Sequence, residues 1–289
     1  MAFQNFIPTV WAAEIETELD RLCVFAEDCN RDFEGGVKKM GESVKINGVG
    51  SPTITVLTKG EHKAKMPSRE QIEDTSVIMY INQMAIFNYA IDDIDAAQMQ
   101  GNVKSKLNQK TSARIASEID SRVAAVCAGA DVPKLFKTAK KLVSGTAGEG
   151  EINILTLLDL AAQRLYENDV PTTGAKLVAV LSPAAHRLYV EAYGKDDTDN
   201  HELMKNGRVG TYHGMVIKMS NNVVKDGAGE HISIRTPDAV AFANPLTHTE
   251  AYRPEDGFED AIKGFTLYDA MVVLPKEIVD AIVTVPAFE

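Results

Sequence analysis

The chain has 289 residues, of which 45% are hydrophobic and 25% are charged, and its formal net charge is −11. This ordinary globular composition is sufficient for one large domain or two smaller ones, and the acidic balance excludes a strongly basic nucleic-acid-binding protein. Three cysteines without a CxxC pair argue against a disulfide framework and a zinc site. No apolar run reaches membrane-spanning length, so the sequence predicts a soluble protein made in the cytoplasm.

The first predicted element is an amphipathic helix that begins at Trp11, its largest apolar anchor. Acidic residues fill its first turns, as the helix dipole favours, and the period breaks at Gly35 and Gly36. The apolar face is formed by Trp11, Ile15, Leu19, Leu22 and Ala26. A helix with no neighbour in sequence needs a docking surface, either on its own domain or on another subunit.

A projecting arm is predicted between residues 44 and 81. Residues 44–46 and 53–57 alternate like the two strands of a hairpin, with a turn predicted at 48–52. A long charged stretch over 58–75 then separates them from a third apolar segment, 76–81. Because an isolated two-stranded ribbon is marginal in water, such an arm needs a partner to lie on.

The longest predicted helix follows a strand over 85–91. After Gly101, apolar residues recur about every four positions, at Val103, Leu107, Ile115, Ile119, Val123 and Cys127. This spacing predicts a helix of about 25 residues, or about 38 Å. Acidic residues at Asp92, Asp93 and Asp95 predict helix capping rather than a calcium loop, whose glycine is missing.

A short segment and a linker are predicted after the long helix, and two groups of cations lie in and after that helix. Residues 133–143 predict a helix or a turn, and the glycines within 144–150 predict a flexible linker rather than a phosphate-binding loop. Two groups of cations predict solvated helix faces rather than a phosphate track. They are Lys104, Lys106, Lys110 and Arg114, and then Lys134, Lys137, Lys140 and Lys141.

An α/β subdomain is predicted from residue 153 onward. Asn153 or Thr156 can cap a helix, and the unbroken apolar run 176–181 predicts a strand buried on both faces. Ser182 with Pro183 then opens a helix to about residue 192. Glycines at 207, 210 and 214 punctuate a strand pair, and short strands are expected from residue 233 to the end, the last being 265–273 and 282–285.

A search for catalytic motifs finds no nucleophile elbow, phosphate-binding loop, dinucleotide fingerprint or zinc-protease motif. His186 lies within an apolar helix and is expected to be packed there. The best group of hard-metal ligands, which reads as a solvated loop, is Asp196, Asp197, Asp199, His201 and Glu202. We therefore predict no enzyme, no catalytic residue, no cofactor and no metal site, with a metal-dependent enzyme as the alternative from another class.

Several motifs, weak alone, are specific in their order and spacing. They are residues 8–25, 30–35 leading to 41–46, 91–98, 207–214 leading to 220–221, and 252–258 with 263–268. Through them the chain resembles tailed-bacteriophage major capsid (coat) proteins of the Hong Kong 97-type fold, over essentially its whole length.

The resemblance implies an α+β Hong Kong 97-like capsid fold. Its parts would be an N-arm (1–43), an extended E-loop hairpin (44–80), a P-domain with a strand and a long spine helix (81–130), an α/β A-domain (131–242), P-domain return strands (243–266) and A-domain C-terminal strands (267–289). No scaffolding domain precedes the arm, so a separate scaffolding protein is expected.

The resemblance also implies self-assembly into pentamers and hexamers of an icosahedral head that encloses double-stranded DNA by non-specific contact. Expected partners are other copies of the chain, the portal, the scaffolding protein and, as an open alternative, a decoration protein, with no membrane. An encapsulin-type compartment shell, with protein cargo, is the rival.

Candidate residues for the interfaces between subunits follow from the same resemblance. They are Trp11, Arg31, Asp32, Glu34, Lys63, Lys65, Arg69, Arg253 and Glu255. Some members of the family cross-link a lysine with an asparagine. Lys63 or Lys65 with Asn244 is a conceivable pair here, although no motif requires it.

Overall fold

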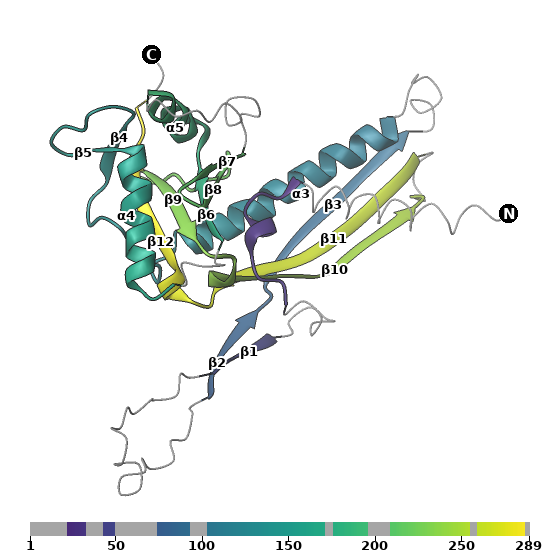
Figure 1. The fold of residues 1–289 in the computed structure, drawn as a ribbon. Coiled ribbons are helices and arrows are strands. Elements are labelled where there is room, and N and C mark those ends of the chain that lie inside the picture. The colour runs from purple at the N-terminus through teal and green to yellow at the C-terminus, as the bar shows by residue number, and fades with distance from the viewer. Residues whose placement is uncertain are drawn as a thin grey trace, which may run out of the picture.

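The longest helix and three long strands extend away from a body that is built on a second, larger sheet (Figure 1). The structure is a computed structural model, and it describes seven stretches of the chain, namely residues 22–32, 43–49, 74–92, 103–170, 176–195, 209–254 and 259–286. Within these stretches the strands form sheets of two, three and seven strands. The chain is therefore of mixed α and β structure, as its sequence predicts.

The body contains a seven-stranded sheet with the strand order β5-β4-β12-β9-β6-β8-β7. The pairs β4–β5, β4–β12 and β6–β8 are parallel, and the other neighbours are antiparallel. Its strands are β4 (Lys140–Val143), β5 (Glu151–Asn153), β6 (Leu177–Leu181), β7 (Val209–Tyr212), β8 (Met215–Met219), β9 (Glu230–Arg235) and β12 (Ile278–Thr284). Helices α4 (Ile154–Glu167) and α5 (Pro183–Lys195) share one hydrophobic core with this sheet.

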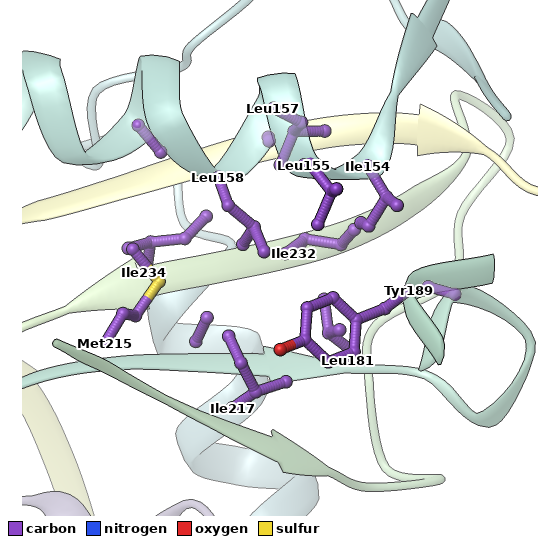
Figure 2. Packing of buried hydrophobic residues seen from close by; sticks show 14 of the residues in the cluster. Ile154, Leu155, Leu157, Leu158, Leu181, Tyr189, Met215, Ile217, Ile232 and Ile234 are labelled. Carbon is purple, nitrogen blue, oxygen red and sulfur yellow. The ribbon is translucent and has the colours of Figure 1, made fainter. Parts of the chain in front are cut away.

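Figure 2 shows the core between the sheet and its two helices. Ile154 and Leu158 of α4 lie beside Ile232 of β9, with Tyr189 of α5 and Leu181 of β6 close by, and each is at most 2% exposed. Burying an aliphatic side chain of this size contributes about 1.5–3 kcal/mol. This core therefore fixes α4 rigidly on the body.

Strand β6 is buried on both faces, as its apolar run predicts. Leu177, Ala179 and Leu181 contribute to the core with α4 and α5. Val178 and Val180, which point the other way, belong to a second core with α3 (Val103–Cys127). The two cores meet at this strand, so β6 joins the body to the long helix.

The predicted helix starts are confirmed in both body helices. The Asn153 side chain accepts a hydrogen bond from the Leu155 N–H at 2.8 Å at the start of α4. The Ser182 hydroxyl accepts one from the Ala185 N–H at 3.1 Å at the start of α5, where Pro183 is the first helical residue. These caps are local features, which is why the sequence reveals them.

Three long antiparallel strands form the second sheet, in the order β10-β11-β3. They are β3 (Gln83–Asp92), β10 (Val240–Tyr252) and β11 (Glu259–Val272). Helix α3 lies along this sheet (Figure 1), and its Ile115, Ile119 and Val123 are buried. The 25-residue helix is the length that the four-residue spacing predicts.

The prediction of short strands after residue 233 is wrong for β10 and β11, which have 13 and 14 residues. Their pairing runs from Val240↔Val272 to Tyr252↔Ala261, with one register shift between Ala243 and Leu246. The domain boundaries predicted at 242/243 and 266/267 consequently fall inside strands. Each strand has buried residues in the second core, with α3, and continues from there into the extended sheet.

A two-stranded ribbon projects from the base of the long sheet (Figure 1). Strand β1 (Ser43–Val49) pairs with β2 (Asp74–Tyr80) in an antiparallel register that joins Ser43 to Tyr80 and Val49 to Asp74. The turn predicted from Gly48 is wrong there, because Gly48 lies inside β1 opposite Thr75. Residues 53–57 lie outside the described residues.

Two further local predictions are corrected by the structure. The segment 133–143 is not helical: it forms bends and an isolated bridge between Lys134 and Asp280, and then β4, where Leu142 is fully buried between β5 and β12. The second cationic group therefore lies on this irregular segment and on a strand instead of a helix face. Asp92 does not cap a helix, because it is the last residue of β3 and is paired with Glu259. Asp93 and Asp95 lie outside the described residues.

Strands β7 and β8 form the predicted glycine-punctuated pair. They are joined by His213 and Gly214, whose φ angles of 47° and 81° both lie in the left-handed region. Two consecutive residues with positive φ are typical of the type I′ turn, whose twist matches that of paired strands. The turn places His213 at the edge of the body.

Candidate assembly surfaces

A short segment at residues 22–32, which we call the anchor, is held in the interior between the two parts of the molecule. At its start, the Asp120 carboxylate of α3 accepts hydrogen bonds from the N–H groups of Val24, Phe25 and Ala26 at 2.8, 3.0 and 3.2 Å. Burial raises the pKa of Asp120 even though these three donors favour its charged form. Asp120 thus satisfies the backbone donors that open the short helix η1 (Ala26–Asp28).

The carbonyl groups of the same turn are bound by Arg235, the last residue of β9, which is fully buried. Its guanidinium donates to the carbonyl oxygen of Phe25 at 2.8 Å and also to that of Asp28. Carbonyl groups at the end of a helical turn carry partial negative charge, so a cation suits this position. An anionic side chain therefore binds the N–H groups of this turn, and a cationic side chain binds its carbonyl groups.

Ion pairs then fix the side chain of Asp28. Its carboxylate lies 2.8 Å from the Lys176 Nζ and 2.5 Å from the Lys218 Nζ, and Lys218 also contacts Glu27 at 2.6 Å. Burial opposes ionisation of Asp28, but the hydrogen bonds and charges of the two lysines outweigh it and lower its pKa. For Lys218, burial is likewise outweighed by the two carboxylates, which raise its pKa.

The anchor continues as a strand-like bridge on β10. The Asn30 N–H donates to the Val240 carbonyl at 2.9 Å, and the Phe242 N–H donates to the Asn30 carbonyl at 2.9 Å. The Arg31 guanidinium lies over the Phe242 ring, 5.3 Å from its centroid, and Asp32 is exposed. Residues 22–32 therefore give both flanking segments of the chain a fixed point of origin.

The three cysteines lie in this same region and are buried. Burial raises the pKa of Cys29, and it raises that of Cys127 to about 12. Thiols with such pKa values carry little thiolate and are poor nucleophiles. The cysteines serve as packing residues.

The junction between α3 and the body is closed by a buried ionic cluster. The Lys134 Nζ lies 2.6 Å from the Asp280 Oδ2 and donates to the carbonyl oxygens of Ala128 and Gly129, just after α3, at 2.8 and 3.0 Å. The His231 Nδ1 lies 2.7 Å from the same carboxylate oxygen of Asp280. Lys134 therefore ties the end of the long helix to β12.

The projecting ribbon has one buried and one exposed face. Met79 and Ile46 are 1% and 3% exposed and pack with Ile81 in a small core against β10 and β11. Ile78 and Tyr80, on the alternate face of β2, are 44% and 58% exposed. Large apolar side chains in this position indicate a surface that another element covers.

Part of the long sheet is also exposed. Ile86 of β3 is 67% exposed, and beside it Lys263 and Glu250 form an ion pair of 3.2 Å across β11 and β10. On β10, the Asn244 side chain accepts a hydrogen bond from the Thr266 hydroxyl at 2.8 Å. Arg253 is exposed just after β10.

The sequence-based interface residues are only partly placed by this structure. Arg31, Asp32 and Arg253 lie among the described residues, at the anchor and beyond the end of β10, and are not brought together. The remaining candidates, which lie outside the described residues, are Trp11, Glu34, Lys63, Lys65, Arg69 and Glu255. The pairing of Lys63 or Lys65 with Asn244 stays a prediction.

The sequence did not single out Asp120 and Arg235, the two residues that hold the anchor. A signal for each exists: Asp120 follows Ile119 on the apolar side of α3, and Arg235 ends the apolar strand β9. A charged residue at a buried position needs a polar partner. The identity of that partner, about 95 residues away for Asp120, cannot be read from spacing.

The other predicted sites are His186 and the acidic group at 196–202. His186 is buried in α5 next to Tyr189, and burial lowers its pKa, which confirms a packed histidine. The acidic group at 196–202 lies outside the described residues. Among the residues that the structure describes, no group of three or more metal-ligating side chains is found. None of the described helices combines the length and hydrophobicity of a membrane span.

Comparison with known proteins finds similarity in structure alone. No family model and no curated protein matches the chain. A chain of Mycobacterium phage Che8 is similar with a TM-score of 0.66 and 24% identity, over 90% of each chain. The capsid of the cyanophage P-SCSP1u is similar with a TM-score of 0.63 and 16% identity, over 86% of this chain and 85% of that one.

A virus-like particle from Pyrococcus furiosus is also similar, with a TM-score of 0.59 and 11% identity, over 96% of this chain and 99% of that one. At identities this low, the structural similarity establishes a shared fold alone. The chain therefore has the fold of tailed-phage major capsid proteins, as the resemblance in sequence implied.

Proposed function

We propose that this chain is the major capsid protein of a tailed bacteriophage, which self-assembles into pentamers and hexamers of an icosahedral head around double-stranded DNA. The observation that carries the proposal is the agreement of fold along nearly the whole chain with phage capsid structures. The capsid role places the protein in the virion and needs no catalytic site, so we retain the prediction that it is not an enzyme.

In this proposal each part of the molecule has a role in the shell. The β1–β2 ribbon and the chain between its strands form the E-loop, which lies on a neighbouring subunit. Its exposed Ile78 and Tyr80 are the side chains that such a contact would cover. Helix α3 and the long sheet form the P-domain, and the seven-stranded sheet with α4 and α5 forms the A-domain.

The anchor gives the N-arm its starting point. The described part of this arm begins in the anchor, whose backbone is bound by Asp120 and Arg235. A fixed origin reduces the conformational freedom that the arm loses when it binds a neighbouring copy. We propose that Trp11 is the main apolar residue of that contact.

The charge of the chain fits a container. A net charge of −11 limits attraction to DNA phosphates, and a packaged duplex must move freely during entry and exit. We propose that contacts with the genome are non-specific. Assembly of such a head also requires a portal and a separate scaffolding protein. A decoration protein is an optional further partner.

An encapsulin-type compartment is the second candidate. It is supported by the similarity to the virus-like particle from Pyrococcus furiosus, which covers 96% of this chain. The cargo distinguishes the two functions. Nuclease-protected DNA in purified particles supports the phage head, and an enclosed protein supports the compartment.

The proposal is tested by negative-stain electron microscopy of the full chain expressed alone and together with the scaffolding protein. Closed shells, tubes or rings of five and six subunits are expected in at least one of the two preparations. If both contain only monomers, the shell function is wrong. A variant in which residues 59–70 are replaced by a short Gly-Ser linker should remain a folded subunit that cannot close a shell.

A further inference from the structure

Two grooves run along α4, one on each side of its exposed ridge. Gln163 and Glu167 form the ridge and line both grooves. The first, which we call the acidic groove, contains Asp159, Tyr166 and His213. The second, which we call the basic groove, is lined by Phe136, Lys137, Leu160 and Arg164.

The acidic groove is a preformed surface. The Asp159 carboxylate accepts a hydrogen bond from the Tyr212 hydroxyl at 3.1 Å and lies 3.2 Å from the His213 Nδ1. The Asp159 side chain is still 48% exposed, and Tyr166 beside it is 39% exposed. The groove therefore presents a negative charge and a ring edge to an incoming side chain, held in place by the β7–β8 turn.

The basic groove has the opposite character. Lys137 and Arg164 are exposed in it, and Leu160 is 38% exposed between them and the ridge. Lys134 also lines the groove, but its ammonium group is bound to Asp280 and to two carbonyl oxygens. Lys137 and Arg164 are thus the cations that this groove can offer to a partner.

The two grooves point in different directions. Asp159 and Arg164 are five residues apart on one helix, which corresponds to a rotation of about 140° around its axis. The grooves lie on opposite sides of the ridge that Gln163 and Glu167 form, so each groove can contact a different neighbour. Two complementary surfaces that face different neighbours generate head-to-tail contacts, which close into a ring when the rotation between copies allows it.

We propose that the acidic groove of one copy receives the basic groove of the next copy around each ring, with Arg164 opposite Asp159 and Leu160 against Tyr166. This inference rests on the proposed shell function and assigns the contact within its rings. Charge complementarity of this kind selects the partner and its orientation, and it rejects contacts between like grooves.

The test uses two charge reversals in the full chain, Asp159→Lys and Arg164→Glu. Each alone places like charges in every ring contact and should lower the yield of rings and shells about tenfold. The double variant restores opposite charges and should recover the wild-type yield. The yields are measured by sedimentation and electron microscopy, and thermal melting confirms that each subunit is folded.

Mixing the two single variants gives a second, independent readout. Their copies can alternate around a ring with every contact attractive, so six-membered rings should form in the mixture, whereas five-membered rings cannot alternate. The control is Arg187→Glu, the same change at an exposed position of α5 outside both grooves, which should assemble like the wild type.

The outcomes separate this contact from the proposed function. If the wild type forms shells and neither reversal reduces them, or if the double variant and the mixture fail to recover, the assigned contact is wrong and the shell function stands. If the wild type forms no rings or shells with or without the scaffolding protein, both the shell function and the assigned contact are wrong.

Discussion

The Nη2 of Arg235 donates a hydrogen bond of 2.8 Å to the carbonyl oxygen of Phe25, which lies 210 residues earlier in the chain. Arg235 ends a central strand of the body, whereas Phe25 belongs to the anchor beside α3. This bond and the three donated to Asp120 join the anchor to both parts of the molecule. The anchor is consequently a structural tie, and its loss should be visible in the stability of the subunit.

Arg235→Met should destabilise the subunit. The substitution fills much of the volume but leaves the carbonyl oxygens of Phe25 and Asp28 buried without their donor, which we expect to cost on the order of 3 kcal/mol. Arg235→Lys keeps the charge and loses the forked geometry, so its cost should be smaller. Urea unfolding of unassembled subunits measures both values, and an unchanged midpoint for the methionine variant would contradict this role.

Asp120→Asn should also destabilise the subunit, although it changes no more than one atom of the side chain. Both carboxylate oxygens accept hydrogen bonds from backbone N–H groups. The NH2 group of asparagine would therefore face a backbone N–H group, and two donors cannot form a hydrogen bond. We expect a loss of about 1–3 kcal/mol in the free energy of unfolding. The matched control is Asp131→Asn, an exposed aspartate, which should leave stability unchanged.

The Asp28 ion pairs should make stability depend on acidic pH. The folded-state pKa of Asp28 lies below its ordinary value of 3.8, so the unfolded chain takes up the proton first. The stabilisation is therefore complete above pH 3.8 and is lost as the pH falls through the lower, folded-state pKa. At pH 7 we expect Asp28→Asn to cost about 2 kcal/mol.

The measurement compares the wild type with Asp28→Asn across this pH range. The difference in unfolding free energy between the two should be constant from pH 7 to about pH 4 and should shrink below it. A difference that grows on acidification would show that Asp28 is not held in its charged form by Lys176 and Lys218.

Local features of the fold are readable from the sequence because their causes lie within a few residues. The caps at Asn153 and Ser182 depend on the next three residues, and the apolar run of β6 reports burial on both faces. The four-residue spacing of α3 reports one long contact face. In each case the pattern and its physical cause occupy the same stretch of chain.

Features that depend on distant partners were predicted incorrectly or missed. Strand β1 pairs with β2 across more than twenty intervening residues, a distance that local alternation of apolar residues does not reveal. Strand β4 contains two lysines beside Leu142, and it becomes a strand because β12, from the end of the chain, supplies its partner. The contacts of Asp120 and Arg235 with the anchor are of the same kind.

The last prediction concerns the two faces of β2. Met79 is 1% exposed in the small core between the ribbon and the long sheet. Met79→Ala should therefore weaken the packing of the ribbon on the sheet by about 2–5 kcal/mol. Tyr80, its neighbour, is 58% exposed, so Tyr80→Ala should leave the stability of the isolated subunit within about 0.5 kcal/mol of the wild type.

The effect of Tyr80→Ala on assembly should differ from its effect on the stability of the subunit. If the exposed face of the ribbon lies on a neighbouring copy, Tyr80→Ala lowers the yield of closed shells even though its subunit is as stable as the wild type. Hydrogen exchange of β1 and β2 in the free subunit separates the cases, since Met79→Ala should accelerate it and Tyr80→Ala should not. Normal shells from Tyr80→Ala together with Ile78→Ala would show that this face is not covered in the particle.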